Sequence, residues 1–214
     1  MKRRAQAFLT LLFWNLQKKE LSQTVCDLIM EHNVPEVLIL SETTQQSRRS
    51  VERLLFQHGY TSRTQLKGNV RVAVYDKIIT SNVVYLREDQ RFTILIYKMD
   101  GQHIMIVGVH LDSPASYPDV NDRYVCATEQ FGLIEAIERI YKVEKTIIIG
   151  DFNMNPFDKG MVSELSLKAT HCKRTALRTK SNKRYFFNPS WSIYSNDLTA
   201  QEGKPTWNYS LCSS

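Results

Sequence analysis

The sequence predicts a layered α/β fold built as a single domain over residues 1–214. With 43% hydrophobic residues among 214, the chain can bury one large core. Apolar residues recur at helical spacing in three segments, and short apolar runs bounded by polar turn residues predict strands between them. Helices, then a series of hairpin strands, then a helix and a strand are typical of sheets with helices on their outer faces.

The first part of the chain alternates predicted strands with predicted helices. The apolar run from Phe8 to Trp14 predicts a first strand, and the run from Val37 to Leu40 predicts a second. Apolar residues at helical spacing predict one helix between these strands and another after them. The two helices are indicated by Leu21, Val25, Leu28 and Ile29, and then by Val51, Leu54 and Leu55.

The middle of the chain predicts hairpin strands followed by a long helix. The predicted strands cover residues 70–75, 83–86, 92–97 and 104–109. Polar turn residues lie between them, at 76–77, 88–89 and 100–101. A helix is then predicted by the apolar residues Ala127, Phe131, Ile134, Ile137 and Tyr141, and it leads into a last apolar strand that ends at Asp151.

The stretch 145–156 is the most informative part of the chain for function. A buried apolar strand there ends in Gly150, Asp151 and Asn153. Residues two apart in an extended chain point to the same side, so the Asp and Asn side chains would present two oxygens to one point. The glycine permits a tight turn or a close approach, and the Asp/Asn pair suits a hard cation or a phosphate ester. The alternative is an ordinary Asn/Asp/Pro turn at the end of a strand.

Three other predicted strands also end in polar residues. Asn15 follows the first strand, Glu42 follows the second, and His110 follows the strand before the long helix. Core packing requires only apolar residues, so it does not explain this pattern. Because ligand sites of α/β proteins lie beyond the ends of strands, the pattern indicates a binding or catalytic site there.

These segments resemble the endonuclease/exonuclease/phosphatase superfamily, which includes deoxyribonuclease I and exonuclease III. The resemblance rests on four motifs in order: Phe-Trp-Asn-Leu at 13–16, Leu-Ser-Glu-Thr at 40–43, Gly-Val-His-Leu-Asp-Ser at 108–113 and Ile-Gly-Asp-Phe-Asn-Met-Asn-Pro at 149–156. It implies a four-layer sandwich in which two mixed β-sheets pack face to face with helices on both outer sides. It also implies a metal-dependent phosphoesterase.

The resemblance implies a role for each strand-end residue. Glu42 matches the principal metal ligand of the family, and Asn15 matches the amide that helps to hold the metal or the scissile phosphate. Asp151 matches the carboxylate that orients or deprotonates the attacking water, and Asn153 the amide that steadies the same site. His110 matches the histidine near the phosphate, although a lone histidine at a strand end is often structural. An oxygen shell of this kind accepts Mg²⁺ or Mn²⁺.

The C-terminal part departs from the family pattern. Members of the family end with a strand that carries an Asp and then with a Ser-Asp-His motif, and no Asp-His dipeptide occurs in this sequence. We therefore expect a C-terminally truncated domain that lacks part of the catalytic apparatus and at least one core strand. A natural truncation, a fragment or altered reading frame, and a diverged member are the alternatives.

The charge pattern favours a polyanionic partner. The net charge is +6, and no acidic residue occurs between positions 173 and 184. The basic residues of this segment are Lys173, Arg174, Arg178, Lys180, Lys183 and Arg184. Aromatic residues at 185–187 follow, so the segment could bind a phosphate backbone and stack a base. The alternative is a solvated loop. Lys18 and Lys19, which follow the first strand, could add to the positive field.

Cysteine usage and hydropathy favour a cytoplasmic protein. The four cysteines are scattered without a Cys-x-x-Cys pair, which argues against a zinc site and a disulfide framework. No apolar segment approaches the roughly 20 residues that span a bilayer. The basic residues at 2–4 before an apolar run are similar to a short signal peptide, but no small-residue cleavage site follows, so we interpret this run as a core strand.

Taken together, the motifs predict a Mg²⁺-dependent phosphodiester hydrolase, most simply a nuclease that acts on DNA or RNA. One alternative is a catalytically impaired member that binds phosphate or nucleic acid. A second is a phosphatase or a phospholipid diesterase of the same superfamily.

Overall fold

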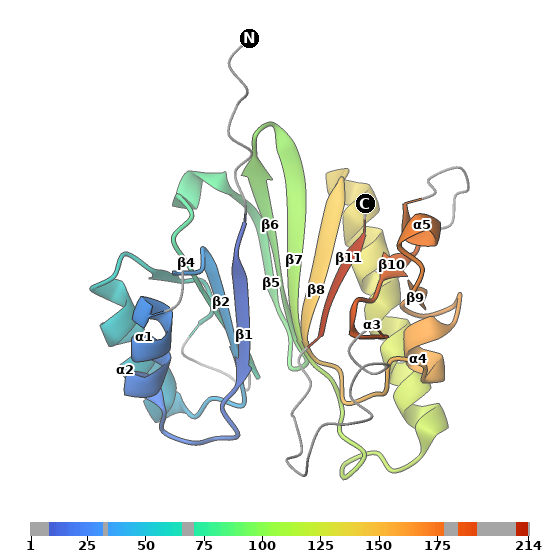
Figure 1. Cartoon of the computed structure of the whole chain (residues 1–214), viewed down its shortest axis with the longest axis horizontal. Helices are drawn as coiled ribbons and strands as arrows, with labels where there is room; N and C mark the ends of the chain where they lie inside the picture. The colour runs from blue at the N-terminus through green and yellow to red at the C-terminus, as the bar shows by residue number, and fades with distance from the viewer. Residues whose placement is uncertain (1–8, 32–33, 66–70, 178–183, 192–208, 214) are drawn as a thin grey trace.

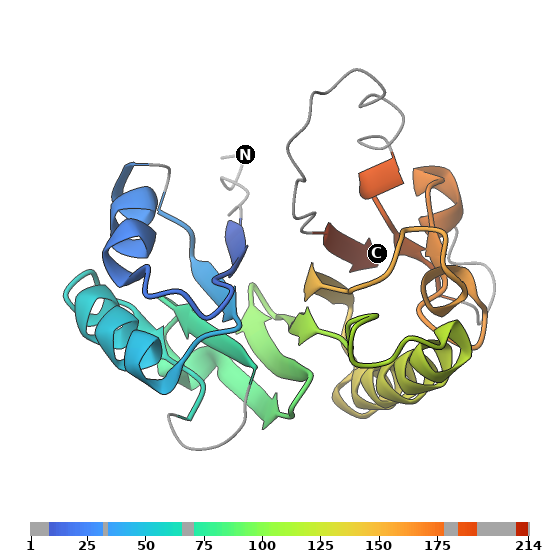
Figure 2. The same cartoon turned by 90° about the horizontal axis from the view of Figure 1, so that it is seen from below.

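The protein is a sandwich of two facing β-sheets with helices on both outer sides, as the sequence predicts (Figure 1). The computed structural model describes residues 9–31, 34–65, 71–177 and 184–191, together with the backbone of 209–213. Seen from below, α1 and α2 cover one sheet, and α3 covers the other (Figure 2). The layers are therefore helix, sheet, sheet and helix.

The smaller sheet has four strands in the order β1-β2-β4-β3. These strands are β1 (Leu11–Asn15), β2 (Val37–Ser41), β3 (Thr61–Ser62) and β4 (Val72–Asp76). β1 and β2 are parallel, whereas β4 runs antiparallel to β2 and β3, so the sheet is mixed. Its outer face packs against α1 (Ser22–Glu31) and α2 (Gln45–Phe56).

The larger sheet has seven strands in the order β5-β6-β7-β8-β11-β10-β9. They are β5 (Val83–Glu88), β6 (Phe92–Met99), β7 (Gln102–His110), β8 (Lys145–Asp151), β9 (Ala169–Thr170), β10 (Phe186–Phe187) and β11 (Tyr209–Ser213). β7 and β8 are parallel, and β11 is antiparallel to β8. β8 therefore has a strand on each side.

Helices pack on the outer face of the larger sheet. The long helix is α3 (Val120–Tyr141), and its apolar side covers the sheet through residues such as Phe131 and Ile134. The remaining helices are α4 (Lys159–Val162), α5 (Lys173–Ala176) and the 3-10 turn η1 (Thr80–Asn82). Within the described residues, no helix is both long enough and apolar enough to cross a bilayer.

Apolar side chains fill the space between the two sheets. Ile39 of β2 and Val72 of β4 meet β7 there, and Gly108 allows the close approach. A Cβ atom at Gly108 would lie 2.8 Å from Val72 Cγ1 and 2.9 Å from Ile39 Cγ2. The sheets thus pack so closely at this level that the ends of their strands are brought together.

A buried polar network joins the sheets at the other end of β4. Arg63 Nη2 lies 2.8 Å from Asp76 Oδ1, and the hydroxyl of Tyr97 on β6 donates to Asp76 Oδ2 at 2.6 Å. Burial, followed by the charge of Asp76, raises the pKa of the Tyr97 phenol, so Tyr97 stays a hydrogen-bond donor. The sheets are thus held together at both ends.

Candidate active site

Four strands end at one edge of the sandwich, at the lower side of Figure 1. Parallel pairing aligns Asn15 of β1 with Ser41 of β2, and His110 of β7 with Asp151 of β8. Because the two sheets face each other, the two pairs of strand ends meet. Asn15 Nδ2 donates to Asp151 Oδ2 at 3.0 Å and so connects the sheets directly.

The side-chain amide of Asn15 lies between two carboxylates. Its Nδ2 donates to Glu42 Oε1 at 3.1 Å as well as to Asp151 Oδ2. Its Oδ1 accepts a hydrogen bond from the backbone N–H of Gln17 at 2.9 Å, which fixes the orientation of the amide. One carboxamide therefore holds Glu42 of the smaller sheet and Asp151 of the larger sheet close to each other.

Glu42 reaches this position because its backbone leaves the extended conformation. Leu38 and Leu40 of β2 face the helices, so alternation would also turn residue 42 toward the helices. Glu42 has φ 49° instead, which rotates its Cβ toward the space between the sheets. Such a conformation costs about 1–3 kcal/mol for a non-glycine residue. Hydrogen bonds from Glu42 N to Arg71 O (3.2 Å) and from Lys18 N to Glu42 O (2.8 Å) hold it.

The imidazole of His110 contacts Glu42 across the two sheets. His110 Nε2 lies 3.1 Å from Glu42 Oε1. A carboxylate oxygen only accepts hydrogen bonds, so Nε2 carries the hydrogen and donates. The ring is buried, and its Nδ1 has no hydrogen-bond partner among the described residues. Among the described residues, the imidazole therefore makes its side-chain hydrogen bond to the carboxylate of Glu42.

β8 ends at Asp151, and the chain turns sharply afterwards. Gly150 has φ 153°, and a Cβ atom there would lie 2.0 Å from Val109 O, so the site requires glycine. Asn153 has φ 50°, and its backbone N–H donates to Asp151 Oδ1 at 3.0 Å. The expectation that residues 151 and 153 lie on one extended strand is therefore wrong. The Asn153 side chain instead donates to Leu111 O at 2.9 Å and ties the ends of β7 and β8 together.

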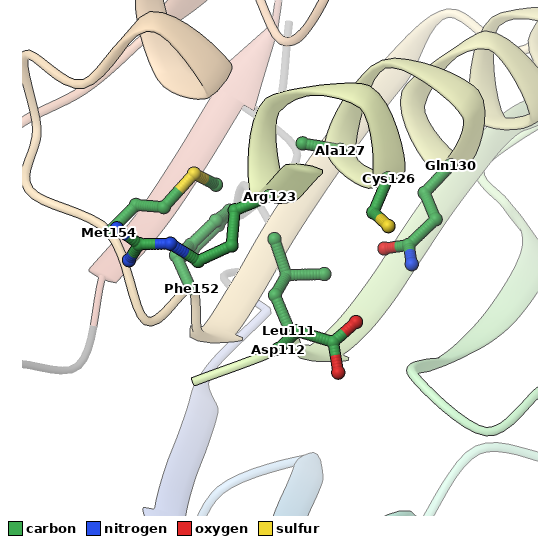
Figure 3. A pocket seen from close by; sticks show the side chains of 8 residues that line it. All are labelled: Leu111, Asp112, Arg123, Cys126, Ala127, Gln130, Phe152 and Met154. Carbon is green, nitrogen blue, oxygen red and sulfur yellow. The ribbon is translucent and has the colours of Figure 1, made fainter. Parts of the chain in front are cut away.

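Two arginines that the sequence did not single out support this edge. Arg123 of α3 donates from Nη1 to Asn153 O at 3.3 Å, and it lines a small cavity beneath the loop (Figure 3). Arg91 forms an ion pair with Asp112, and its carbonyl oxygen accepts from His110 N at 2.8 Å. Neither arginine belongs to one of the four motifs. Each contact depends on packing between distant segments, which a local sequence pattern does not reveal.

The structure does not bring the described basic residues of the segment 173–184 to this edge. Lys173 and Arg174 lie on α5, which Figure 1 shows toward the upper ends of the strands. Arg184 lies 2.9 Å from Glu138 Oε1 and donates to Glu144 O at 3.2 Å, just before β8 begins. β8 carries the chain roughly 20 Å from there to its end at Asp151. The other three, Arg178, Lys180 and Lys183, lie outside the described residues.

The donor set suits a hard divalent cation. Carboxylates of Glu42 and Asp151 approach each other through the Asn15 amide, and the Glu42 side chain is 28% exposed. Within the described ranges, no three His, Cys, Asp or Glu side chains form a ready metal cluster. Mg²⁺ usually binds through one or two carboxylates and keeps several waters, so the two carboxylates fit such an ion, whereas the Asn15 oxygen accepts from Gln17 N.

Comparison with solved structures identifies the fold. No family model and no curated protein matches the sequence. The structure is similar to the human nocturnin catalytic domain with bound sulfate, at 15% identity and a TM-score of 0.59, over 91% of this chain and 76% of that one. It is similar to D. rerio TDP2 complexed with a single-strand DNA product, at 16% identity and a TM-score of 0.59, over 96% of this chain and 84% of that one. It is also similar to sphingomyelinase C from Streptomyces griseocarneus, at 11% identity and a TM-score of 0.57, over 97% of this chain and 84% of that one. The chain has the deoxyribonuclease I-like fold of the endonuclease/exonuclease/phosphatase superfamily.

Proposed function

We propose that the protein is a metal-dependent phosphodiester hydrolase that acts on nucleic acid, with water attacking phosphorus in line. The observation that carries the proposal is the arrangement around Asn15, whose amide joins Glu42 and Asp151 while His110 donates to Glu42. Hydrolysis of a phosphodiester requires a positioned water, neutralisation of the phosphate charge and help for the leaving oxygen. Asp151 could position the water, and a metal ion held by Glu42 would neutralise the phosphate charge.

Asp151 is the residue proposed to orient and deprotonate the attacking water. Its carboxylate is held in one plane, since Oδ1 accepts from Asn153 N and Oδ2 accepts from Asn15 Nδ2. An ionised carboxylate has about four acceptor positions, so acceptor capacity remains for a water. A carboxylate with a fixed orientation places that water in line with the phosphorus without a further loss of entropy.

His110 and Asn15 are proposed to bind the phosphoryl oxygens. The Nε2–H group of His110 donates to Glu42 in this structure. When a substrate is bound, it could donate to a phosphoryl oxygen instead. Burial of the ring limits its motion, so the donor keeps its direction. The Asn15 amide nitrogen lies between the two carboxylates and can act in the same way.

Glu42 is proposed as the principal metal ligand, with a carboxylate oxygen of Asp151 as a second ligand. A bound Mg²⁺ or Mn²⁺ supplies charge neutralisation at the phosphate and polarises a phosphoryl oxygen. Without it, Glu42 and Asp151 would repel a phosphate as well as each other.

The substrate proposed is DNA or RNA. The net charge of +6 favours a polyanion, and Lys18 is exposed with its backbone bonded to Glu42 O at 2.8 Å, which places a basic residue at the rim. A TDP2 structure similar to this one holds a single-strand DNA product. The similarity to sphingomyelinase C favours a phospholipid diester as the second candidate.

The proposal is tested by incubating the protein with labelled single- and double-stranded DNA and RNA, and with sphingomyelin vesicles, in Mg²⁺, in Mn²⁺ and in chelator. We expect cleavage of a nucleic acid that requires metal and falls at least 100-fold in Glu42→Gln, since the removed charge is the one proposed to hold the metal at the reacting phosphate. Glu129→Gln, which changes an exposed glutamate on α3, is the matched control. Cleavage of vesicles alone would favour the second candidate, and equal rates in Glu42→Gln and wild type would refute the proposed mechanism.

A further inference from the structure

A small, mostly apolar cavity lies beneath the loop that follows β8 (Figure 3). It lies between the N-terminal half of α3 and the ends of β7 and β8. Its lining residues are Leu111, Asp112, Arg123, Cys126, Ala127, Gln130, Phe152 and Met154. The volume of about 10 Å³ is close to the least that holds one water molecule.

Three polar atoms of the lining residues are buried without a hydrogen-bond partner among the described residues. They are the donor Arg123 Nε and the acceptors Gln130 Oε1 and Asp112 Oδ1. The carboxylate of Asp112 lies in the same wall and forms an ion pair with Arg91.

Packing alone does not explain an arginine at position 123. Its side chain is half-buried beside the apolar residues Ala127, Phe152 and Met154, and an N–H group that is shielded from water costs free energy unless it has a partner. Arg123 Nη1 does have a partner, because it donates to Asn153 O at 3.3 Å. The guanidinium thus spans from the cavity to the loop that follows β8.

Asn153 transmits this contact to the proposed catalytic carboxylate. Three different groups of Asn153 are hydrogen-bonded: its carbonyl to Arg123, its side chain to Leu111 O, and its N–H to Asp151 Oδ1. Its left-handed φ of 50° is a strained conformation that these contacts maintain. Movement of Asn153 would therefore release one of the two hydrogen bonds that orient the Asp151 carboxylate.

We propose that Arg123 is a positioning residue of this site: through its hydrogen bond to Asn153 O, it holds the Asn153 loop so that Asp151 keeps the orientation that hydrolysis needs. This inference rests on the proposed function, but the positioning itself is a structural property. It can therefore be measured whether or not the protein hydrolyses a given substrate.

The test compares Arg123→Met and Arg123→Lys with Arg139→Met, which changes an exposed arginine in the last turn of the same helix. The first measurement is hydrogen exchange of the Asn153 amide, whose N–H is bonded to Asp151. We expect its protection to fall about tenfold in Arg123→Met, to recover partly in Arg123→Lys and to stay unchanged in Arg139→Met. The second is steady-state hydrolysis, where we expect kcat to fall about tenfold in Arg123→Met with KM within twofold, as for other residues that orient a catalytic group.

The outcomes separate the inference from the proposed function. Changed protection of Asn153 in a protein that hydrolyses nothing would support the positioning and refute the function. Wild-type protection and wild-type kcat in Arg123→Met would overturn the positioning role. If protection and kcat fall equally in Arg123→Met and Arg139→Met, and this fall parallels a loss of thermal stability, the positioning role would also be overturned. If Arg123→Met does not fold, the same comparison is made with Arg123→Lys, for which unchanged protection and kcat overturn the inference.

Discussion

Replacing Gly150 by alanine should damage both stability and the geometry of the site. The residue lies just before Asp151 and pairs with Val109 of β7. Its φ of 153° favours glycine, and an added Cβ would lie 2.0 Å from Val109 O and 2.8 Å from Val109 N. These neighbours are backbone atoms, so no side-chain rotation can relieve the clash.

The expected size of the effect has two parts. Overpacking in a tight interior costs about 1–3 kcal/mol. The unfavourable backbone conformation adds about 1–3 kcal/mol for a residue with a side chain. For a domain of this size, 1 kcal/mol shifts Tm by roughly 2–4 °C, so we expect Tm to fall by roughly 5–20 °C. Because β8 must move away from β7, the Asp151 carboxylate shifts, and a misplacement of about 1 Å lowers kcat by about 100-fold.

The assay is thermal unfolding followed by circular dichroism, together with kcat of the folded variant. Gly132→Ala is the matched control, since a Cβ atom on Gly132 of α3 meets nothing within 4 Å. In a helix, alanine is favoured over glycine by about 0.5–1 kcal/mol, so this variant should be slightly more stable than wild type. A Gly150→Ala protein with wild-type Tm and kcat would refute the reasoning about the β7–β8 approach.

Three further predictions concern charge. Lys18→Ala should raise KM for nucleic acid and reduce the slope of log affinity against log salt by about one. Lys98→Ala, which removes an exposed lysine on β6, should change neither KM nor the slope. An unchanged slope in Lys18→Ala would contradict the role of Lys18. Burial raises the pKa of the Glu138 carboxyl, so the folded state binds that proton more tightly than the unfolded state. Its contribution to stability is thus present below the ordinary carboxyl pKa and is lost as pH rises through the raised pKa. Urea unfolding at several pH values should show a flatter dependence in Glu138→Gln, and an identical slope would contradict the assignment. Mg²⁺ at 100 times its Kd should stabilise the wild-type protein by about 2.7 kcal/mol and should not stabilise Glu42→Gln; an equal shift in Tm for both proteins would place the ion elsewhere.

The main elements of the fold could be predicted from local pattern because each has a strong signal. β8 is an apolar run between polar residues, and α3 carries apolar residues at helical spacing along the side that covers the larger sheet. The prediction of α3 began at Ala127 and omitted its first two turns. The helix begins after Asp119, whose side chain accepts a hydrogen bond from Asn121 N. β3, β9 and β10 have two residues each, which is too short for any periodicity.

The site could be predicted only in part, for a related reason. Asn15, Glu42, His110 and Asp151 each follow an apolar run, and the ends of parallel neighbouring strands meet, so the strand pattern indicated one edge. The left-handed conformation of Glu42 has no signature in the sequence, whereas that of Asn153 had only the general preference of Asn for turns as a signal. The partners of Arg123 and Arg184 depend on how α3 packs against distant segments, which local pattern does not reveal.

The most direct measurement is single-turnover hydrolysis of a labelled oligonucleotide by wild type, Asp151→Asn and Asp158→Asn, with metal removed by chelator and then restored. Asp158 lies in the loop that follows β8, so its variant is a control for the loss of a nearby acidic charge. We predict hydrolysis that stops with chelator, returns with Mg²⁺ or Mn²⁺, persists in Asp158→Asn and is absent in Asp151→Asn. Hydrolysis that survives in Asp151→Asn, or that ignores the chelator, would contradict a metal-dependent site built on Glu42 and Asp151.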